Sequence, residues 1–254
     1  MLRKVLYIDL TRQESWVEER QELFESWMGG TGVGIRLLQE ECPAGTDPLS
    51  PEAPIILSIG PLNGVFPVAT KTAATFKSPL TGNLGESYAG GRLSLALRFA
   101  GHEAVVIKGR AERPSYISIN DQEVRIKDAT SIWGVDAQTT GIILRDREPG
   151  VGRRSIIRIG PAGEAGVRFA CVMVDTYRHF GRLGLGAVFG SKNLKALAVS
   201  GTEHVDVPDI KRYKEVYNRL YKTAVQTEVM EKYHDIGTSV NISVRLAAKR
   251  GMAI

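Results

Sequence analysis

A glycine-rich stretch flanked by cations is the part of this sequence whose residue types and spacing point most directly to chemistry. It runs from Gly181 to Lys192, with the letters GRLGLGAVFGSK, and follows Arg178-His179-Phe180. Glycine has no Cβ atom, so its main-chain amides can approach a ligand closely, and amides at a helix start attract anions. Arg178, Arg182 and Lys192 would add positive charge. The stretch predicts an anion-binding loop, and the alternative is a turn whose glycines serve only close packing.

Part of this pattern occurs twice in the chain. Gly91-Arg92-Leu93 recurs as Gly181-Arg182-Leu183, 90 residues later, and Ile59-Gly60-Pro61 recurs as Ile159-Gly160-Pro161, 100 residues later. Two motifs repeated in the same order predict an internal duplication, with a second unit from Arg154 to about Gly201. We expect the two glycine-rich loops to meet and to hold the two ends of one extended, multiply charged ligand.

Composition and charge exclude several classes of function. The 254 residues are 43% hydrophobic and 24% charged, as in ordinary globular proteins. No apolar run approaches the roughly 20 residues that span a bilayer, and the N-terminus is charged too early for a signal peptide. The net charge of +5 is not gathered into a basic run. We therefore expect a cytoplasmic protein that binds neither membranes nor nucleic acid.

The cysteines and histidines do not form a metal-binding pattern. Cys42 and Cys171 are the only cysteines and lie far apart, so we expect both to be small buried residues. The histidines lack ligand spacing, which disfavours a stand-alone metal hydrolase. The loop at Gly29-Gly30-Thr31-Gly32 lacks the spacing of a dinucleotide fingerprint and follows a helix pattern, so we do not assign a nucleotide cofactor to it.

The elements that must position the loops can be read from apolar periodicity. Strand patterns occur at 3–9, 14–18, 53–59, 69–77, 115–119, 123–127 and 167–173, and helix patterns at 19–27, 93–100 and 137–146. The segment 28–34 opens a further helix that continues through Ile35 to Glu41. Beyond residue 203 the pattern becomes helical, with helices starting near 208 and 238. The fold class is therefore α+β, with two β-sheets in an internally duplicated domain over 1–203 and the beginning of a helical domain over 204–254.

These motifs resemble the N-terminal domain of the tungsten-dependent aldehyde:ferredoxin oxidoreductase family. The matching segments keep one consistent order from about residue 3 to 203. They are MGGTGVG at 28–34, DPLSPE at 47–52, GPLNG at 60–64, KSPLTG at 77–82, IGPAGE at 159–164 and GAVFGSKNLKA at 186–196.

The resemblance implies a cofactor and a set of residues that bind it. Members of the family use a tungsten or molybdenum ion held by two pterins, with a [4Fe–4S] cluster nearby, and oxidise aldehydes to carboxylic acids with ferredoxin as electron acceptor. The implied cofactor-binding residues are Lys71, Tyr88, Gly90, Arg178, His179, Gly181 and Arg182. Their side chains and amides would meet the pterin phosphates, and the main chain of Tyr88 and His179 would face a bridging Mg²⁺.

Three of these positions depart from the family pattern. Lys71 stands where arginine is common, which keeps the charge but loses the bidentate fork. Tyr88 stands where asparagine is common, and His179 replaces a small residue. A contact made by the main chain survives such changes, whereas one made by the side chain does not.

The resemblance also defines what this chain would lack. The cluster-binding cysteines and most active-site residues of the family lie in later helical domains, so we expect those domains, or a second chain, as partners, together with ferredoxin or an electron-transfer subunit. A homo-oligomer is compatible with this organisation. We name no catalytic residue in this chain. Glu103 and Glu164 are the two acidic residues nearest the motifs. We expect Glu164 to form a salt bridge.

Two other functions remain open at this stage. The same scaffold could support another low-potential reduction, such as that of an aromatic acyl-CoA, because the substrate pocket would lie in other domains. Alternatively, the chain could be a non-catalytic scaffold subunit. The retained Arg178, Arg182 and glycines weigh against this, because a pure scaffold has no evident need for paired anion seats.

Overall fold

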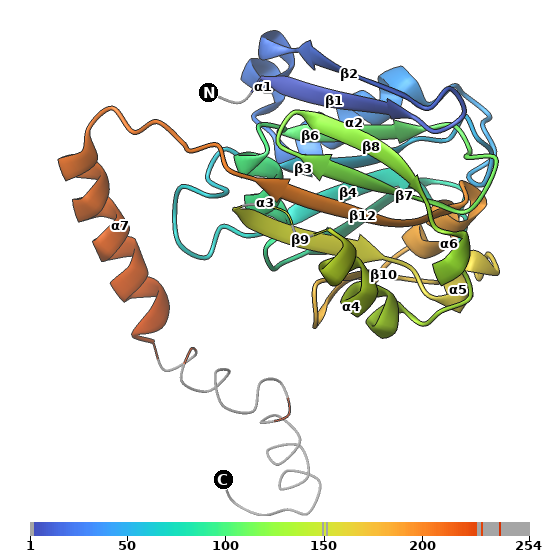
Figure 1. Cartoon of the computed structure of the whole chain (residues 1–254). Helices are drawn as coiled ribbons and strands as arrows, with labels where there is room; N and C mark the ends of the chain where they lie inside the picture. Colours follow the sequence, from blue (N-terminus) through green and yellow to red (C-terminus); the bar gives the residue numbers. More distant parts are fainter. Residues whose placement is uncertain (1–2, 149, 151, 228–229, 231–238, 240–254) are drawn as a thin grey trace, which may run out of the picture. The chain divides into compact units, whose positions relative to one another are not determined.

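The computed structural model describes residues 3–148, 150, 152–227, 230 and 239. The chain divides into two compact units, residues 1–65 with 69–205 and residues 66–68 with 206–254. The first unit contains two β-sheets, each with six strands among the described residues (Figure 1). In the same described part, no helix has both the length and the hydrophobicity needed to pass through a lipid bilayer.

The first half of the larger unit ends with the strand after the first glycine-rich loop. Its elements are β1 (Lys4–Asp9), β2 (Glu14–Glu19), α1 (Gln21–Trp27), α2 (Gly30–Glu41), β3 (Ile55–Ile59), β4 (Thr72–Lys77), β5 (Leu84–Ala89), α3 (Leu93–Phe99) and β6 (Ala104–Lys108).

The second half follows the same plan and ends with the strand after the second glycine-rich loop. Its elements are β7 (Ser115–Asn120), β8 (Glu123–Asp128), the 3-10 helix η1 (Thr130–Ile132), α4 (Ala137–Arg147), β9 (Arg153–Arg158), α5 (Pro161–Glu164), β10 (Val172–Val174), β11 (Arg178–Phe180), α6 (Leu185–Ser191) and β12 (Leu194–Gly201).

The two sheets have the same strand order, which confirms the predicted duplication. The first is ordered β2-β1-β6-β3-β4-β5, and the second, read in the matching direction, β8-β7-β12-β9-β10-β11. β1 and β6 pair in parallel, as do β7 and β12, and the other neighbours are antiparallel. The predicted start of the second unit at Arg154 was wrong, because the hairpin β7–β8 takes the place of β1–β2 and belongs to the repeat.

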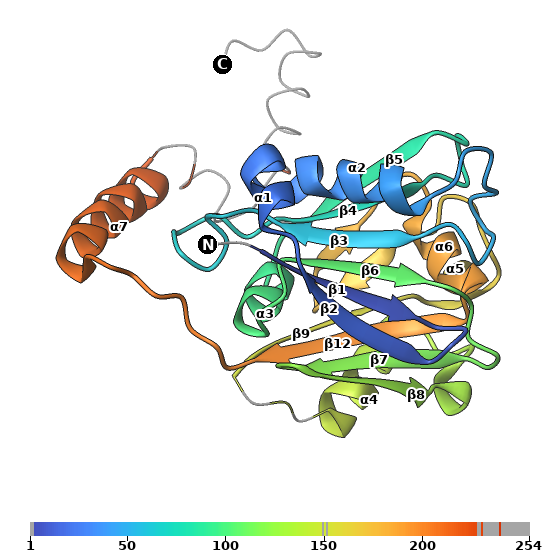
Figure 2. The same ribbon diagram turned by 90° about the horizontal axis from the view of Figure 1, so that it is seen from above.

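Both sheets bury one face in a shared core. In β1, Leu6 and Ile8 belong to this core, whereas Val5 and Tyr7 point to the opposite face, as the period of two in a strand requires. That opposite face is covered by α1 and α2, while α4 lies on the outer face of the second sheet (Figure 2). Ile132 of η1 packs into the same outer cluster as α4. α3 and α6 pack into the shared core. The loops that precede α3 and α6 are thus carried by two buried helices.

The outer helices are attached to their sheets in the same way in each half. Ser58 Oγ donates a hydrogen bond to the carbonyl of Gly30, the first residue of α2, at 2.8 Å. At the equivalent position of β9, Arg158 Nε donates to the carbonyl of Ala137, the first residue of α4, at 2.7 Å. Glycine is the fifth residue of each helix, and a Cβ on Gly141 would lie 2.6 Å from the Arg158 guanidinium. The duplication therefore includes these helix–sheet contacts, although the residues that make them lie outside the repeated Ile-Gly-Pro and Gly-Arg-Leu motifs.

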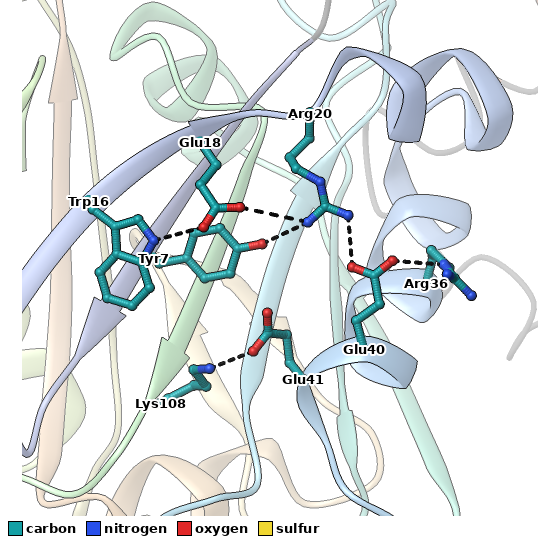
Figure 3. Close-up of polar contacts among 8 residues, drawn as sticks. All are labelled: Tyr7, Trp16, Glu18, Arg20, Arg36, Glu40, Glu41 and Lys108. Atoms are coloured by element: carbon teal, nitrogen blue, oxygen red, sulfur yellow. Dashed lines mark hydrogen bonds and ion pairs between the residues drawn. The ribbon is translucent and has the colours of Figure 1, made fainter.

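A polar network ties the hairpin β1–β2 to α2 (Figure 3). The ring of Trp16 stacks on that of Tyr7, with centroids 5.2 Å apart. Arg20 donates to the Tyr7 hydroxyl at 3.1 Å and pairs with Glu40 at 2.8 Å. Burial raises the pKa of Tyr7 to about 12. These contacts help to cover the hydrophobic cluster that contains Val5 and Tyr7 on the outer face of the first sheet.

Several predicted boundaries differ from the observed ones. The strand predicted at 167–173 is confined to Val172–Val174, because α5 and the turns after it occupy the preceding segment. The strand predicted at 69–77 begins at Thr72. Cys42 is only partly buried and Cys171 is exposed, so the expectation of two buried cysteines was wrong.

In the smaller unit, α7 (Ile210–Val225) confirms the first helix predicted there. Its rings form a ladder in which Tyr213 contacts Phe66 and Tyr217, and Tyr217 stacks on Tyr221. The helix predicted to start at Thr238 lies outside the described residues. The domain boundary near residue 203 stays a prediction.

Candidate functional site

The candidate site lies where an edge strand of one sheet meets an edge strand of the other. β5 and β11 pack against each other. Tyr88 pairs with Ala73 in the register of β4–β5, and His179 pairs with Met173 in that of β10–β11. Tyr88 and His179 are therefore equivalent positions. The equivalent glycines are then Gly90 and Gly181, one residue away from the alignment that the repeated Gly-Arg-Leu motif suggests.

The two glycine-rich loops meet at this edge, as expected from the duplication. A Cβ added to Gly91 would lie 3.5 Å from Cγ of Arg178 and 3.4 Å from a carboxylate oxygen of Asp175. The amide of Arg92 donates to the same carboxylate at 3.3 Å. On the other side of the first loop, Nζ of Lys71 lies 3.7 Å from the Cβ position of Gly90. The structure thus brings together Lys71, Gly90 and Arg178.

The second loop is fixed by hydrogen bonds from the first half. The amide of Arg182 donates to Ser87 Oγ on β5 at 3.3 Å, and Ser78 Oγ donates to the carbonyl of Leu183 at 2.8 Å. Gly181 itself is exposed, and no other group lies within 4 Å of its Cβ position. The loop therefore holds Gly181 and Arg182 beside the strand of Tyr88 while leaving Gly181 open to a ligand.

The four glycines of the second stretch have different roles. Positions Gly184, Gly186 and Gly190 leave no room for a side chain, because main-chain atoms of Arg168, Cys171 and Gly163 respectively occupy the space that a Cβ would need. Gly184 also has a φ of 84°, which favours glycine. The packing alternative is therefore correct for these three positions, and Gly181 alone is available for close approach of a ligand.

The cations of the site have no carboxylate partners in the part of the chain that the structure describes. Lys71, Arg178 and Arg182 are exposed, and none of their side chains forms an ion pair there. Three uncompensated positive charges beside an open glycine and a buried one form a donor set that suits phosphate groups. The residues present therefore fit the phosphate ends of a large anionic cofactor.

Two of the three substituted positions, Tyr88 and His179, differ in how their side chains are used. The Tyr88 hydroxyl donates to Glu86 at 3.0 Å and lies 2.8 Å from Thr31 Oγ1, near the start of α2. The side chain of Tyr88 is thus committed to the outer face, and a ligand contact at this position would use its main chain. His179 is exposed at the equivalent position of β11.

Lys192 does not belong to the anion seat, contrary to the expectation from the sequence. Its side chain is fully buried, and Nζ donates to the carbonyls of Pro51 and Gly109 at 3.0 and 3.1 Å. Burial lowers the pKa of Lys192 to about 7. The residue joins the second half to two loops of the first.

This burial predicts a pH dependence of stability. Between about pH 7 and the ordinary lysine pKa of about 10.4, the unfolded chain binds a proton at Lys192 that the folded chain does not. The free energy of unfolding should therefore rise from about pH 7 to pH 9 in urea titrations. Lys192→Met should flatten this rise, whereas Lys211→Met on exposed α7 should not. An equal rise in the Lys192→Met variant would contradict the assignment.

The two acids nearest the motifs have structural roles. Glu164 forms a buried ion pair with Lys195 and accepts a hydrogen bond from the amide of Gly134 at 2.8 Å. The salt bridge predicted for Glu164 is thus present. Glu103 accepts from the amide of Lys4 at 2.7 Å and lies 3.7 Å from Arg98. Neither carboxylate faces the loops of the candidate site.

Asp175 is a site residue that the sequence analysis missed. It lies between β10 and β11 with a φ of 49°, and its carboxylate joins the amide of Arg92 to Ser155 Oγ, at 3.3 and 2.9 Å. A signal was available, since aspartate tolerates the left-handed conformation that a tight turn before Arg178 needs.

Among the described residues, no cluster of three or more His, Cys, Asp or Glu side chains could hold a metal ion.

Comparisons with known proteins found a matching family and related proteins. The family described as "Aldehyde ferredoxin oxidoreductase, N-terminal domain" matches residues 5–201. The tungsten-containing aldehyde ferredoxin oxidoreductase of Pyrococcus furiosus is 39% identical over 247 residues, covering 95% of this chain and 40% of that protein. The aliphatic sulfonate oxidoreductase, WOR-like subunit, of the same organism is 33% identical over 235 residues, covering 86% of this chain and 38% of that protein.

A solved structure matches the fold. The active site complex BamBC of benzoyl coenzyme A reductase, in complex with 1,5-dienoyl-CoA, superposes with a TM-score of 0.83 and 28% sequence identity. The match covers 91% of this chain and 35% of that one. The chain spans about 40% of the length of the curated relatives that it matches.

Proposed function

The chain belongs to the aldehyde ferredoxin oxidoreductase family, and on that premise we propose that it forms the cofactor-binding base of a tungsten or molybdenum bis-pterin oxidoreductase. The whole protein would oxidise aldehydes to carboxylic acids and pass the electrons to ferredoxin or an electron-transfer subunit. The observation that carries this proposal is the meeting of the two glycine-rich loops, where Lys71 lies beside Gly90, Arg178 beside Gly91 and Arg182 next to the open Gly181, none of the three cations having an ion-pair partner among the described residues.

Each residue of the site has a role in this proposal. Arg178 and Arg182 bind pterin phosphates through their guanidinium forks, and Lys71 adds a point charge beside Gly90. Gly90 and Gly181 allow the main chain to contact the ligand. The carbonyls of Tyr88 and His179 would hold a Mg²⁺ ion, which would neutralise part of the phosphate charge. When bound, the metal bis-pterin would supply the two-electron redox chemistry.

The remaining parts of the proposed enzyme lie outside the matched region. A [4Fe–4S] cluster needs cysteine thiolates, and Cys42 and Cys171 cannot supply four. We therefore propose that the cluster, the substrate pocket and the catalytic side chains are contributed by domains corresponding to the part of the relatives that this chain does not match, whether in a longer protein or in a second chain.

We predict that cofactor retention depends on Gly181 and Arg182. A charge-assisted phosphate contact contributes about 1.5–3 kcal/mol, so Arg182→Ala should weaken retention by about one to two decades. Gly181→Val should lower retention as well, because its side chain would occupy the open approach. The measurement is tungsten or molybdenum content and pterin content after co-expression with the remaining domains.

The matched control is Arg113→Ala, which removes an exposed arginine outside the site. Gly181→Val should leave the fold intact, because no group lies within 4 Å of its Cβ position, and circular dichroism checks this. Full retention of metal and pterin in both site variants would contradict the proposal and would favour a non-catalytic scaffold.

A second candidate reaction is the reduction of an aromatic acyl-CoA. The structural match to a benzoyl coenzyme A reductase complex, at a TM-score of 0.83, favours it. The two reactions are separated by assaying the assembled protein with an aldehyde and oxidised viologen dye, and in parallel with benzoyl-CoA and a low-potential reductant. Turnover of aldehyde without turnover of the acyl-CoA is the result that we expect.

A further inference from the structure

Four arginines line a second cleft next to the candidate site. None of the seven proposed cofactor-binding residues lines it, but Arg92 of the first glycine-rich loop and Asp175 do. The cleft has a volume of about 290 Å³ and lies against β9 and α4. Arg92, Arg145, Arg154 and Arg158 line it, and Asp175 is the one carboxylate among its lining residues. Four positive charges against one negative charge make it a candidate for an anionic ligand.

Two of these arginines are anchored on one side of the guanidinium group. Arg158 donates from Nε to the carbonyl of Ala137 at 2.7 Å, and from Nη1 to the carbonyls of Ile156 and Asp175. Arg154 donates from Nη1 to the carbonyls of Arg145 and Glu148. Within the described chain, neither Nη2 group donates to a protein atom. Each fork is therefore held in place by its bonded atoms while Nη2 remains available to a ligand.

The charge of Arg158 is buried without a direct counter-ion. Only 3% of this residue is exposed, and it forms no ion pair with any described residue. Burial lowers the pKa of its guanidinium. The carboxylate of Asp175 is already occupied by Ser155 Oγ and the amides of Ile156 and Arg92, and it also lies 3.9 Å from Nε of the exposed Arg92 side chain. A buried charge is costly unless it is paired, so an anion in the cleft would be stabilised by it.

The backbone of α4 is shaped around this arginine. A Cβ on Gly141 would lie 2.6 Å from Cζ and from Nη2 of Arg158, so any larger residue there would displace the guanidinium group. Gly141 also lines the cleft. A glycine inside a helix costs roughly 1 kcal/mol relative to alanine, and at this position it keeps a charged fork at the cleft wall.

We propose that this cleft binds a diphosphate group, such as that of a soluble nucleoside diphosphate. Guanidinium forks match phosphate oxygens in planar, bidentate pairs, and anchored forks lose little entropy when they bind. The volume suits a diphosphate and not a drug-sized apolar ligand, since ligand pockets usually measure about 300–1,000 Å³ and are mainly apolar. This site is additional to the proposed cofactor site and does not depend on it.

The test is calorimetric titration of the cofactor-free 254-residue chain with pyrophosphate, ADP, adenosine and sulfate. We expect the cleft to bind pyrophosphate and ADP in addition to any binding at the loops of Lys71, Arg178 and Arg182, with no binding of adenosine and much weaker binding of sulfate. The affinity should fall with added salt. Equal affinities for pyrophosphate and ADP would assign recognition to the diphosphate alone, and a tighter ADP complex would add the nucleoside, so both results support the site.

Variants separate this cleft from the proposed cofactor loops. Arg145→Ala and Arg92→Ala should each weaken pyrophosphate binding by about tenfold, because a charge-assisted contact is lost. Both residues are exposed, so the fold should survive. Arg113→Ala, which removes an exposed arginine outside both sites, should leave the affinity unchanged.

Three results would overturn the proposal. Equal affinities for sulfate and pyrophosphate would show unspecific attraction, and unchanged binding in both Arg145→Ala and Arg92→Ala would exclude the cleft. Loss of binding in Arg182→Ala alone would assign the diphosphate to the cofactor loops. Failure of this proposal leaves the cofactor-retention experiment unaffected, because that experiment uses different residues and a different readout.

Discussion

Replacing Gly190 by alanine is expected to lower the free energy of unfolding by about 3 kcal/mol, the upper end of the usual range for overpacking. Gly190 lies in α6, and the carbonyl of Gly163 occupies the position that a Cβ would need. The obstacle is main chain, so it cannot turn away as a side chain could, and α5 and α6 would have to separate. Urea unfolding followed by circular dichroism measures the change.

The sign of this effect makes the test sharp. From helix propensity alone, an alanine in place of a helical glycine should stabilise the chain by up to about 1 kcal/mol. The matched control is Gly181→Ala, which lies in the same stretch with open space around it and should change stability little. A stabilised Gly190→Ala variant would show that the contact between α5 and α6 is not as close as described.

Glu164→Gln is expected to destabilise the chain by about 3–5 kcal/mol, because it leaves the buried ammonium group of Lys195 without its counter-ion. The side chains of Lys195 and Glu164 are 0% and 7% exposed. The amide oxygen of glutamine can still accept from Gly134, so the variant removes the charge and keeps the shape. Thermal and urea unfolding of the single and double variants measure the coupling.

The double variant Glu164→Gln with Lys195→Met should recover most of the loss, because no buried charge then remains unpaired. The control is Glu123→Gln, whose partner Arg125 is 61% exposed, where a change below about 1 kcal/mol is expected. Equal losses for Glu164→Gln and Glu123→Gln would contradict the account of a buried pair.

The repeated motifs were sufficient to predict two related sheets, but not where the second repeat begins. Ile-Gly-Pro lies at the end of the equivalent strands β3 and β9, and Gly-Arg-Leu lies near the start of the equivalent helices α3 and α6, so both motifs mark corresponding parts of the two halves. The hairpins β1–β2 and β7–β8 need only alternating apolar residues, and their connections differ, with the register of the first closing at Asp9 and Glu14 and that of the second at Asn120 and Glu123. Many sequences satisfy that requirement, so the repeat left no motif there.

The candidate site could be predicted in part, and the limit lies in what local pattern encodes. A glycine in a sequence does not reveal whether the space beside it holds a ligand or another main chain, so Gly181 and Gly190 read alike. Lys192 reads as a flanking cation, yet the contact of its Nζ with Pro51 and Gly109 depends on how the two halves pack. These contacts depend on the tertiary structure, and the spacing of residues along the sequence does not encode them.

The matched strand registers of the two halves carry an evolutionary consequence. A protein with one half alone would expose the β5 edge, and two identical copies meeting through that edge would form a symmetric seat with the same side chains at both ends of its ligand. Fusion into one chain releases the two ends to diverge. Tyr88 now corresponds to His179, so the two ends of the proposed seat carry different side chains, and we expect a ligand with two similar ends to bind in a single orientation.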